Sequence, residues 1–302
     1  MSLSTATTAA LRAAGLEPGA IQTLVLAALD EDLAGGVDAT TTATVPSALS
    51  GSAAVVARVT GVVAGLPVAA AVFETVLGSD VRVSFPVADG DRVGPGTAVL
   101  RTEGPVRGLL TAERTALNLL CHLSGVATLT RAWVDAIAGT GAAIRDTRKT
   151  MPGLRALEKY AVRRGGGQNH RMSLSDAALV KDNHVMAAGG VAAAFAAVRE
   201  MFPDLPVEVE CDTVEQVKEA VVAGADLILC DNMADHDLRA SVALAHPAGV
   251  RLEASGGLTL SRARDVAATG VDYLSVGALT HSVPALDLGL DLDRTSGSGR
   301  TR

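Results

Sequence analysis

Apolar and polar positions divide the chain into two regimes, and the first predicts a module of mixed helices and strands. Apolar residues at helical spacing between residues 20 and 33 predict a helix that ends in the turn DEDLAGGVDATT. From Gly51, the short β-branched runs AAVVARV, GVVAGL and VRVSFPV are separated by glycine and proline, with the helical segment PVAAAVFETVLG between the last two runs. This pattern predicts an α+β module of about 110 residues built on antiparallel strands.

A further helix is predicted over TAERTALNLL, with Thr111 as its N-cap. In this assignment Arg114 lies in the first turn, where a cation opposes the helix dipole. Such an arginine is either an ordinary surface residue or part of a helix end that faces an anion.

The second regime is a repeated alternation of apolar runs and helix-patterned segments. The runs are AAIRD from Ala142, AALVKD from Ala177, VEVECD from Val207, LILCDN from Leu227, RLEASG from Arg251 and YLSVGAL from Tyr273. The later runs recur at roughly the 20- to 24-residue period of a βα unit, which predicts a parallel sheet covered by helices. Because no GxGxxG follows the first run, a closed or nearly closed barrel is favoured over a doubly wound sheet.

Cationic residues are concentrated between Ile144 and His184. This segment holds nine Lys/Arg and four Asp/Glu, although the whole chain has a net charge of -7. A solvated helix face would explain the charges, but several cations stand at strand ends or beside the turn GGG. That placement favours a pocket for a small polyanion.

Composition narrows the class of protein. The chain has 302 residues, of which 48% are hydrophobic and 2% are aromatic. A sizeable core is therefore expected, whereas the low aromatic content and negative charge argue against nucleic-acid binding. Cys121, Cys211 and Cys230 have no metal-type CxxC spacing and are expected to be buried, reduced thiols. We find neither a signal-peptide pattern nor an apolar run long enough for a membrane helix, so a soluble cytoplasmic protein is expected.

Polar residues cluster where the predicted barrel strands end, which is where barrel active sites form. Ser255, Gly256 and Gly257 after one strand, and Val276, Gly277 and Ala278 after the next, resemble a phosphate cradle in which backbone N–H groups close on an anion. Glu210 and Asp231 end neighbouring strands and would accept ribose hydroxyls or hold a metal, unless they simply pair with nearby cations. Together these features indicate a site for phosphorylated, multiply anionic substrates.

The motifs resemble those of the quinolinate phosphoribosyltransferase family over nearly the whole chain. The matching stretches are EDLAGGVDATT, LLTAERTALNLLCHLSGVAT, IRDTRKTMPGLRALEKYAVRRGGGQNHRMSLSDAALVKDNH, VEVECDTVEQ, LEASGGLT and GVDYLSVGALTHS. The resemblance implies that quinolinate and phosphoribosyl pyrophosphate give nicotinate mononucleotide, pyrophosphate and carbon dioxide, with Mg²⁺, in NAD biosynthesis. It also implies a homodimer, an N-terminal α/β sandwich over residues 1–115 and an incomplete α/β barrel over residues 116–290. Residues 291–302 are expected to form a disordered tail.

The resemblance also implies roles for individual residues. It makes Arg148, His170 and Arg171 ligands of the quinolinate carboxylates, with Thr147 of the same DTRKT motif beside the substrate. Catalytic roles fall to Lys149, Lys181, Glu210 and Asp231. Glu210 and Asp231 are also implied to meet the ribose hydroxyls and Mg²⁺, directly or indirectly, and the two glycine loops to hold the 5′-phosphate. Arg114 is implied to enter the site of the partner subunit.

Three alternatives stay open at this point. A paralogue associated with molybdate transport operons shares the fold and many motifs with a different substrate. The barrel alone also fits a lysine-dependent aldolase with Lys149 or Lys181 as the Schiff base. A non-catalytic phosphometabolite-binding protein would bind ligand without turnover.

Overall fold

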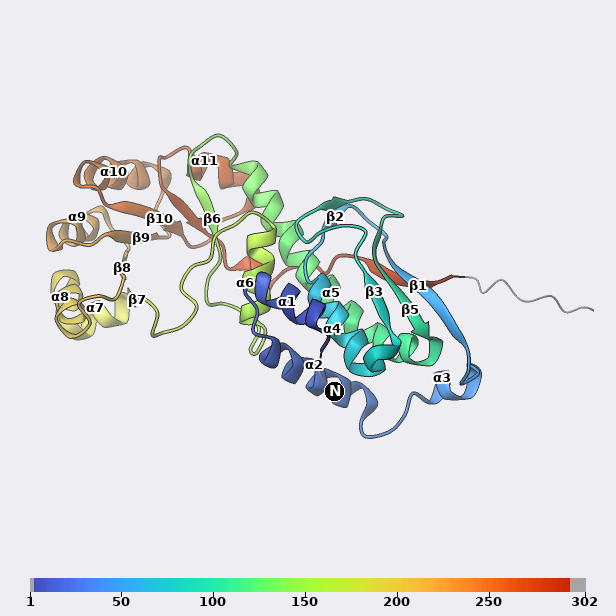
Figure 1. Cartoon of the computed structure of the whole chain (residues 1–302). Helices are drawn as coiled ribbons and strands as arrows, with labels where there is room; N and C mark the ends of the chain where they lie inside the picture. Colours follow the sequence, from blue (N-terminus) through green and yellow to red (C-terminus); the bar gives the residue numbers. More distant parts are fainter. Residues whose placement is uncertain (1–2, 294–302) are drawn as a thin grey trace, which may run out of the picture. The chain divides into compact units, whose positions relative to one another are not determined.

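The computed structural model describes residues 3–293, and these form two compact units (Figure 1). Unit 1 contains residues up to Thr128, together with Ala156–Gly165 and the segment from Val283. Unit 2 contains Leu129–Arg155 and Gly166–Ser282. The predicted boundary after residue 115 therefore moves to residue 128, and two later segments of the chain return to unit 1.

Unit 1 is built on a four-stranded antiparallel sheet with the order β12-β1-β5-β3. Its strands are β1 (Ser50–Ala57), β3 (Arg82–Ser84), β5 (Ala98–Pro105) and β12 (Leu288–Leu292), and a separate pair is formed by β2 (Gly61–Val62) and β4 (Arg92–Val93). The first helices are α1 (Thr5–Ala13), α2 (Pro18–Leu33), α3 (Ala39–Thr44) and α4 (Leu66–Leu77), followed by the 3₁₀ turn η1 (Gly78–Asp80). Helix α4 is nearly all apolar and packs against α1, α2 and β5, which makes it the centre of the core. These elements confirm the predicted antiparallel module.

The helix predicted from Thr111 is longer than expected. Helix α5 runs from Val106 to Ala136, so Thr111 lies inside it and its hydroxyl donates to the carbonyl of Arg107 at 2.9 Å. The N-cap assignment for Thr111 and the first-turn position of Arg114 were therefore wrong. The residues before Thr111, VRGLL, contain one glycine and no other helix breaker. The helix therefore begins directly after the end of β5. Helix α5 also crosses the boundary between the two units.

The C-terminal segment is ordered further than predicted. Asp291 and Leu292 belong to β12, which pairs with β1, and the backbone N–H of Asp293 donates to Ser52 at 2.9 Å. The tail predicted over 291–302 thus begins no earlier than residue 294, and the rest of it lies outside the described residues.

Unit 2 is a parallel six-stranded sheet with the order β6-β11-β10-β9-β8-β7. Its strands are β6 (Ala143–Arg145), β7 (Ala178–Val180), β8 (Val207–Cys211), β9 (Leu227–Asp231), β10 (Arg251–Ser255) and β11 (Tyr273–Ser275). All six coincide with the predicted apolar runs. Strands β6 and β7 are the two edges, so the sheet is the incomplete α/β barrel that was expected.

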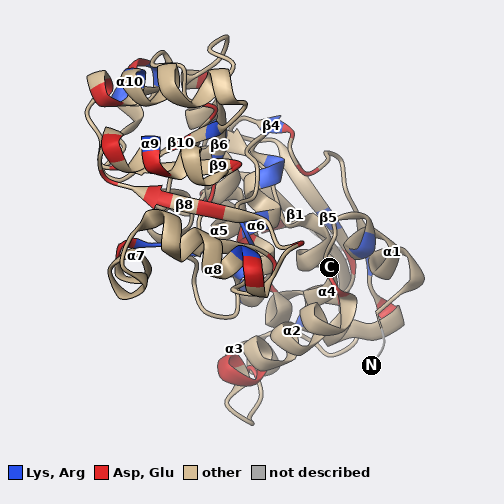
Figure 2. Cartoon of the chain, turned by 90° about the vertical axis from the view of Figure 1, so that its left-hand side faces the viewer, with Lys and Arg blue, Asp and Glu red and all other residues tan. Residues whose placement is uncertain are grey.

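Helices follow the strands of unit 2 in the expected alternation. They are α7 (Asp182–Ala188), α8 (Val191–Met201), α9 (Val214–Ala223), α10 (Asp235–Ala245), α11 (Ala263–Ala267) and α12 (Ala278–His281), with the 3₁₀ turns η2 (His246–Ala248) and η3 (Leu260–Arg262). Helix α6 (Arg155–Arg164) lies between β6 and β7 in the sequence, but its residues from Ala156 onward belong to unit 1. Along β8, Val209 and Cys211 are buried on one face, and the acidic residues, shown in red in Figure 2, alternate with them on the other.

Candidate active site

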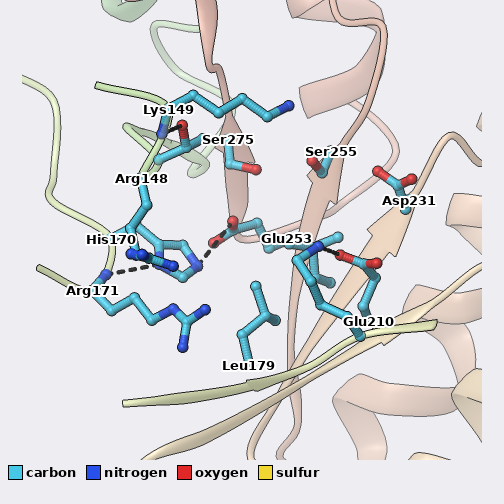
Figure 3. Close-up of a pocket in the computed structure, with 13 residues that line it drawn as sticks. Arg148, Lys149, His170, Arg171, Leu179, Glu210, Asp231, Glu253, Ser255 and Ser275 are labelled. Atoms are coloured by element: carbon cyan, nitrogen blue, oxygen red, sulfur yellow. Dashed lines mark hydrogen bonds and ion pairs between the residues drawn. The ribbon is translucent and has the colours of Figure 1, made fainter. Parts of the chain in front are cut away.

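The carboxyl ends of the strands of unit 2 surround a cavity of about 400 Å³ (Figure 3). The residues that line it are Thr147, Arg148, Lys149, His170, Arg171, Leu179, Lys181, Glu210, Leu229, Asp231, Glu253, Ser255 and Ser275. Nine of these residues were predicted from the sequence as site residues. Parallel strands place their carboxyl ends at one edge of a sheet, which is why residues so distant in sequence meet here.

Acidic and hydroxyl groups form one side of the cavity. Asp231 ends β9 and lies in register with Ser255, which ends β10, while Glu210 lies in register with Leu229. The ammonium of Lys181, at the end of β7, forms an ion pair with Glu210. The amide of Asn232 donates to Asp231 at 2.7 Å. Carboxylate oxygens are therefore fixed at the mouth of the cavity, where they can accept hydroxyl hydrogens.

Guanidinium groups form the opposite side. Arg148 and Lys149 follow β6, and Arg171 lies in the segment that returns from α6. Burial, together with the positive charge of Arg148, lowers the pKa of Arg171 below its usual value. Two guanidinium groups that repel each other in this way are stabilised by a bound anion.

The segment that carries His170 and Arg171 is fixed to the end of β6 by a buried carboxylate. Asp146 accepts the backbone N–H of His170 at 2.8 Å and the side-chain amide of Asn169 at 2.5 Å. The backbone of Gln168 also pairs with β6 through Ile144. Asp146 is fully buried, so these hydrogen bonds offset the cost of removing its charge from water.

A network of ionisable groups surrounds His170, and two of its members, His170 and Glu253, line the cavity. His170 Nε2 is 2.7 Å from Glu208 and 3.7 Å from Glu253, and Arg145 pairs with the other oxygen of Glu253 at 2.6 Å. The guanidinium of Arg145 also lies over the ring of Tyr273, 4.3 Å from its centroid. Burial, followed by the negative charge of Glu208, raises the pKa of Glu253, although His170 and Arg145 act in the opposite direction. His170, Glu208 and Glu253 are spaced as metal ligands could be, but they already pair with one another and with Arg145.

Of the two glycine loops, Ser255 lines this cavity, whereas the glycines do not. Gly256 and Gly257 have φ of +84° and +58° and line a second cavity of about 580 Å³ with Arg239 and Arg262. Gly277 does not have a positive φ, and a Cβ placed there would lie 3.0 Å from Cδ of Lys149. The glycine of this loop therefore lets the side chains of Lys149 and His281 approach the backbone closely. Val276 and Ala278 flank Gly277 at the start of α12.

Arg114 lies in unit 1, where it is exposed on α5. The structure describes one chain, so the predicted insertion of Arg114 into a partner's site stays a prediction.

Four residues that line the cavity were missed in the sequence: Leu179, Leu229, Glu253 and Ser275. Side chains two residues apart on a strand point to the same face. Counting two residues back from Asp231 gives Leu229, and counting back from Ser255 gives Glu253. This two-residue period is the feature of the sequence that could have identified the residues deeper in the cavity.

The chain matches models of both domains of one enzyme family. Residues 38–124 match the N-terminal domain of quinolinate phosphoribosyl transferase, and residues 126–291 match its C-terminal domain. This chain belongs to the quinolinate phosphoribosyltransferase family.

Individual members of the quinolinate phosphoribosyltransferase family agree with this assignment. The chain is 54% identical over 275 residues to a carboxylating nicotinate-nucleotide pyrophosphorylase of Mycobacterium leprae, with 88% of this chain and 94% of the relative covered. It is 43% identical to a probable enzyme of the same name from Bacillus subtilis, covering 80% of this chain and 83% of the relative. The solved structure of NadC from Streptococcus pyogenes superposes with a TM-score of 0.88 at 40% identity, covering 92% and 98% of the two chains. Among the described residues, no helix is long and apolar enough to cross a membrane.

Proposed function

We propose that this chain transfers the phosphoribosyl group of phosphoribosyl pyrophosphate to quinolinate and releases pyrophosphate and carbon dioxide, giving nicotinate mononucleotide for NAD synthesis. The observation that carries the proposal is the division of one cavity into a cationic side and an acidic edge. Arg148, Lys149 and Arg171 form the cationic side, while Glu210 and Asp231 form the edge. The cationic side suits a planar dicarboxylate, and the acidic edge suits the hydroxyls of a ribose.

Quinolinate carries two adjacent carboxylates, which two guanidinium groups can bind in a defined plane. Arg148 and Arg171 are the guanidiniums that line the cavity, and burial together with the positive charge of Arg148 lowers the pKa of Arg171. His170 was expected to bind a carboxylate directly. In this geometry, however, its ring nitrogens contact Glu208 and the backbone of Arg171.

The transfer step places positive charge on C1 of the ribose as pyrophosphate departs. Glu210 and Asp231 stand at the cavity edge, where a fixed negative charge favours the cationic sugar. Lys149 and Lys181 are the nearby cations for the departing pyrophosphate, and Lys149 is held in place by Thr280, which donates to its carbonyl at 2.7 Å. Fixed orientation of the two substrates in one cavity supplies further rate acceleration.

Mg²⁺ is proposed as the cofactor, since Glu210 and Asp231 offer the oxygen ligands that this ion prefers. Bound there or through water, it would neutralise charge on the pyrophosphate. The His170, Glu208 and Glu253 group is a poorer fit, because its atoms are buried and already paired.

Decarboxylation follows from the product of the transfer step. Once the ring nitrogen carries the ribosyl group it is cationic, and that charge stabilises the electron pair that departing carbon dioxide leaves on the neighbouring carbon. A proton from water then adds to this carbon and gives nicotinate mononucleotide. No covalent lysine intermediate is needed. The amine of Lys181 is engaged in an ion pair with Glu210, which disfavours the aldolase alternative with Lys181 as the Schiff base.

The proposed assembly is a homodimer in which Arg114 of each subunit enters the site of the other. Its exposure on α5 is compatible with this role.

The proposal is tested with purified protein, quinolinate, phosphoribosyl pyrophosphate and Mg²⁺, with the nucleotide and carbon dioxide followed by mass spectrometry. Product that requires all three components, and that disappears when EDTA removes the metal, is expected. Turnover of nicotinate without release of carbon dioxide, or binding without turnover, would refute it.

A further inference from the structure

Two buried carboxylates lie beside the ring of His170, and the proposed chemistry gives neither of them a task. Glu208 is 5% exposed and Glu253 is 0% exposed. One oxygen of each, Oε1, lacks a hydrogen-bond partner. Burying two negative charges is costly unless cations and hydrogen bonds compensate for them. Arg145 pairs with Glu253, and His170 is the group within ion-pair distance of Glu208, which Arg145 and Arg171 influence through their charge alone.

The ring of His170 is held at both nitrogens. Nε2 is 2.7 Å from Glu208, and Nδ1 accepts the backbone N–H of Arg171 at 2.7 Å. A ring that accepts at Nδ1 carries its hydrogen at Nε2, which is the nitrogen within ion-pair distance of Glu208. Figure 3 shows the ring between the backbone of Arg171 and the carboxylate of Glu253.

These contacts connect β8 to the cationic side of the cavity. Glu208 is the second residue of a central strand, and it lies on the same face as Glu210 two residues later. The segment that carries Arg171 is a loop, held from the β6 side by Asp146. Glu208 and His170 therefore provide the second support of this loop, which fixes where the guanidinium of Arg171 lies.

We infer that Glu208 is a positioning residue for quinolinate binding: it fixes the ring of His170, and through that ring the backbone that presents Arg171 to the substrate. This inference rests on the proposed function, because it assigns quinolinate to the cationic side of the cavity. Glu253 lies 3.7 Å from Nε2 of His170 and forms an ion pair with Arg145, so it also helps to hold the ring in place.

The test compares Glu208→Ala, which removes the acceptor, with Glu208→Gln, which keeps an acceptor oxygen at the same reach. Glu208→Ala is expected to raise the KM for quinolinate by roughly tenfold or more, as loss of a charged hydrogen bond does, and to leave the KM for phosphoribosyl pyrophosphate within about twofold. Glu208→Gln is expected to recover most of this loss. Glu200→Gln, at an exposed position of α8, is the matched control and should change neither constant.

The outcomes distinguish failure of the proposed function from failure of the positioning role of Glu208. Absence of quinolinate turnover by the unaltered chain counts against the proposed function alone. An active chain in which Glu208→Ala alters both KM values equally, or neither, overturns the positioning role. If Glu208→Ala and Glu208→Gln raise the KM for quinolinate equally, the charge of Glu208 matters and its contact with the ring of His170 does not. If Glu208→Ala does not fold, Glu208→Leu fills the same space without an acceptor and replaces it.

A double-mutant cycle adds a readout that a purely structural role would not move. In a His170→Ala background, Glu208→Ala should raise the quinolinate KM by less than about twofold, because the contact through which it acts is already gone. Full additivity of the two changes would contradict the inference.

Discussion

At the residue scale, the orientation of Asp231 depends on the absence of a side chain at Gly256. Asn232 has a positive φ of 54°, its backbone N–H donates to Ser255 at 2.9 Å, and its amide donates to Asp231 at 2.7 Å. A Cβ on Gly256 would lie 2.3 Å from the amide oxygen of Asn232. The glycine that the sequence indicated as part of a phosphate cradle therefore also makes room for the residue that holds a predicted catalytic acid.

We predict that Gly256→Ala raises the KM for phosphoribosyl pyrophosphate several-fold more than the KM for quinolinate. The methyl group displaces Asn232, and it adds strain at a φ of +84°, so stability should also fall by about 1–3 kcal/mol. Steady-state kinetics and urea denaturation measure the two effects.

Gly249→Ala is the control for this change. Gly249 has a φ of +77° with nothing within 4 Å of the added Cβ, so this variant carries the backbone strain without the collision. A similar kinetic effect in both variants would remove the proposed link to Asp231.

The cysteines give a second prediction at this scale. Cys211 and Cys230 are buried and unpaired, whereas Cys121 is half-buried, which confirms the expected free thiols but not full burial of all three. Burial raises the pKa of Cys230 to about 12 and also raises that of Cys211. Both thiols thus stay protonated and unreactive at about pH 8.

Iodoacetamide should therefore alkylate neither Cys211 nor Cys230 in the folded protein at about pH 8, and both in concentrated urea. Peptide mass spectrometry after timed quenching measures this. Alkylation of either residue at the rate found in urea would show that the β8–β9 region opens readily.

At the scale of elements, the spacing of apolar residues identified the strands well but placed the helix ends poorly. The six parallel strands were predictable because short apolar runs recur with polar residues at their ends. The start of α5 was not, because Thr111 is a good N-cap residue that instead bonds to the carbonyl of Arg107 inside a longer helix. The preference of Thr111 for a capping position therefore did not decide where the helix begins, because α5 follows β5 directly.

The same contrast holds for the candidate site. Residues after strand ends, such as Arg148 and Asp231, were predictable from the barrel rule. The buried layer was not, because the positions of Glu253 and Arg145 near strand ends do not show that the two residues pair with each other. Only the spatial pairing of these charges shows that they support the site.

Helix α9, which follows the strand that carries Glu210, begins with a reciprocal cap. The hydroxyl of Thr213 accepts the backbone N–H of Gln216 at 3.2 Å, and the side chain of Gln216 accepts the N–H of Thr213 at 3.2 Å. We predict that Thr213→Ala lowers the free energy of unfolding by about 1 kcal/mol, and that Thr213→Ser restores it. Urea denaturation monitored by circular dichroism provides the measurement. No difference between Ala and Ser would show that this cap does not contribute to stability.

At the scale of the whole molecule, the cationic segment is shared between two units. Helix α6 lies in the sequence between Lys149 and His170, yet its residues from Ala156 onward belong to unit 1. There Glu158 pairs with His122 at 2.8 Å, and Tyr160 donates to Asp89 at 2.5 Å. The cations of this helix are not among the residues that line the cavity. The lining cations come from the strand ends and the glycine loop on either side of α6, which are the positions that the sequence indicated.

The placement of Arg114 gives the prediction that tests the whole assembly. Arg114 is exposed in unit 1, whereas Arg171 lines the cavity of unit 2. If each site of a homodimer uses Arg114 of one subunit and Arg171 of the other, Arg114→Ala and Arg171→Ala should each abolish most activity. A mixed dimer of the two variants would then have one site with both changes and one unaltered site.

Refolding the two variants together in equal amounts should therefore recover about a quarter of the unaltered activity, because half of the dimers are mixed and each has one intact site. Refolding each variant alone is the control and should recover none. Recovery only in the mixture requires that Arg114 acts in the partner's site. If the mixture stays as inactive as its components, although dimers with differently tagged subunits are isolated from it, then Arg114 acts within its own subunit.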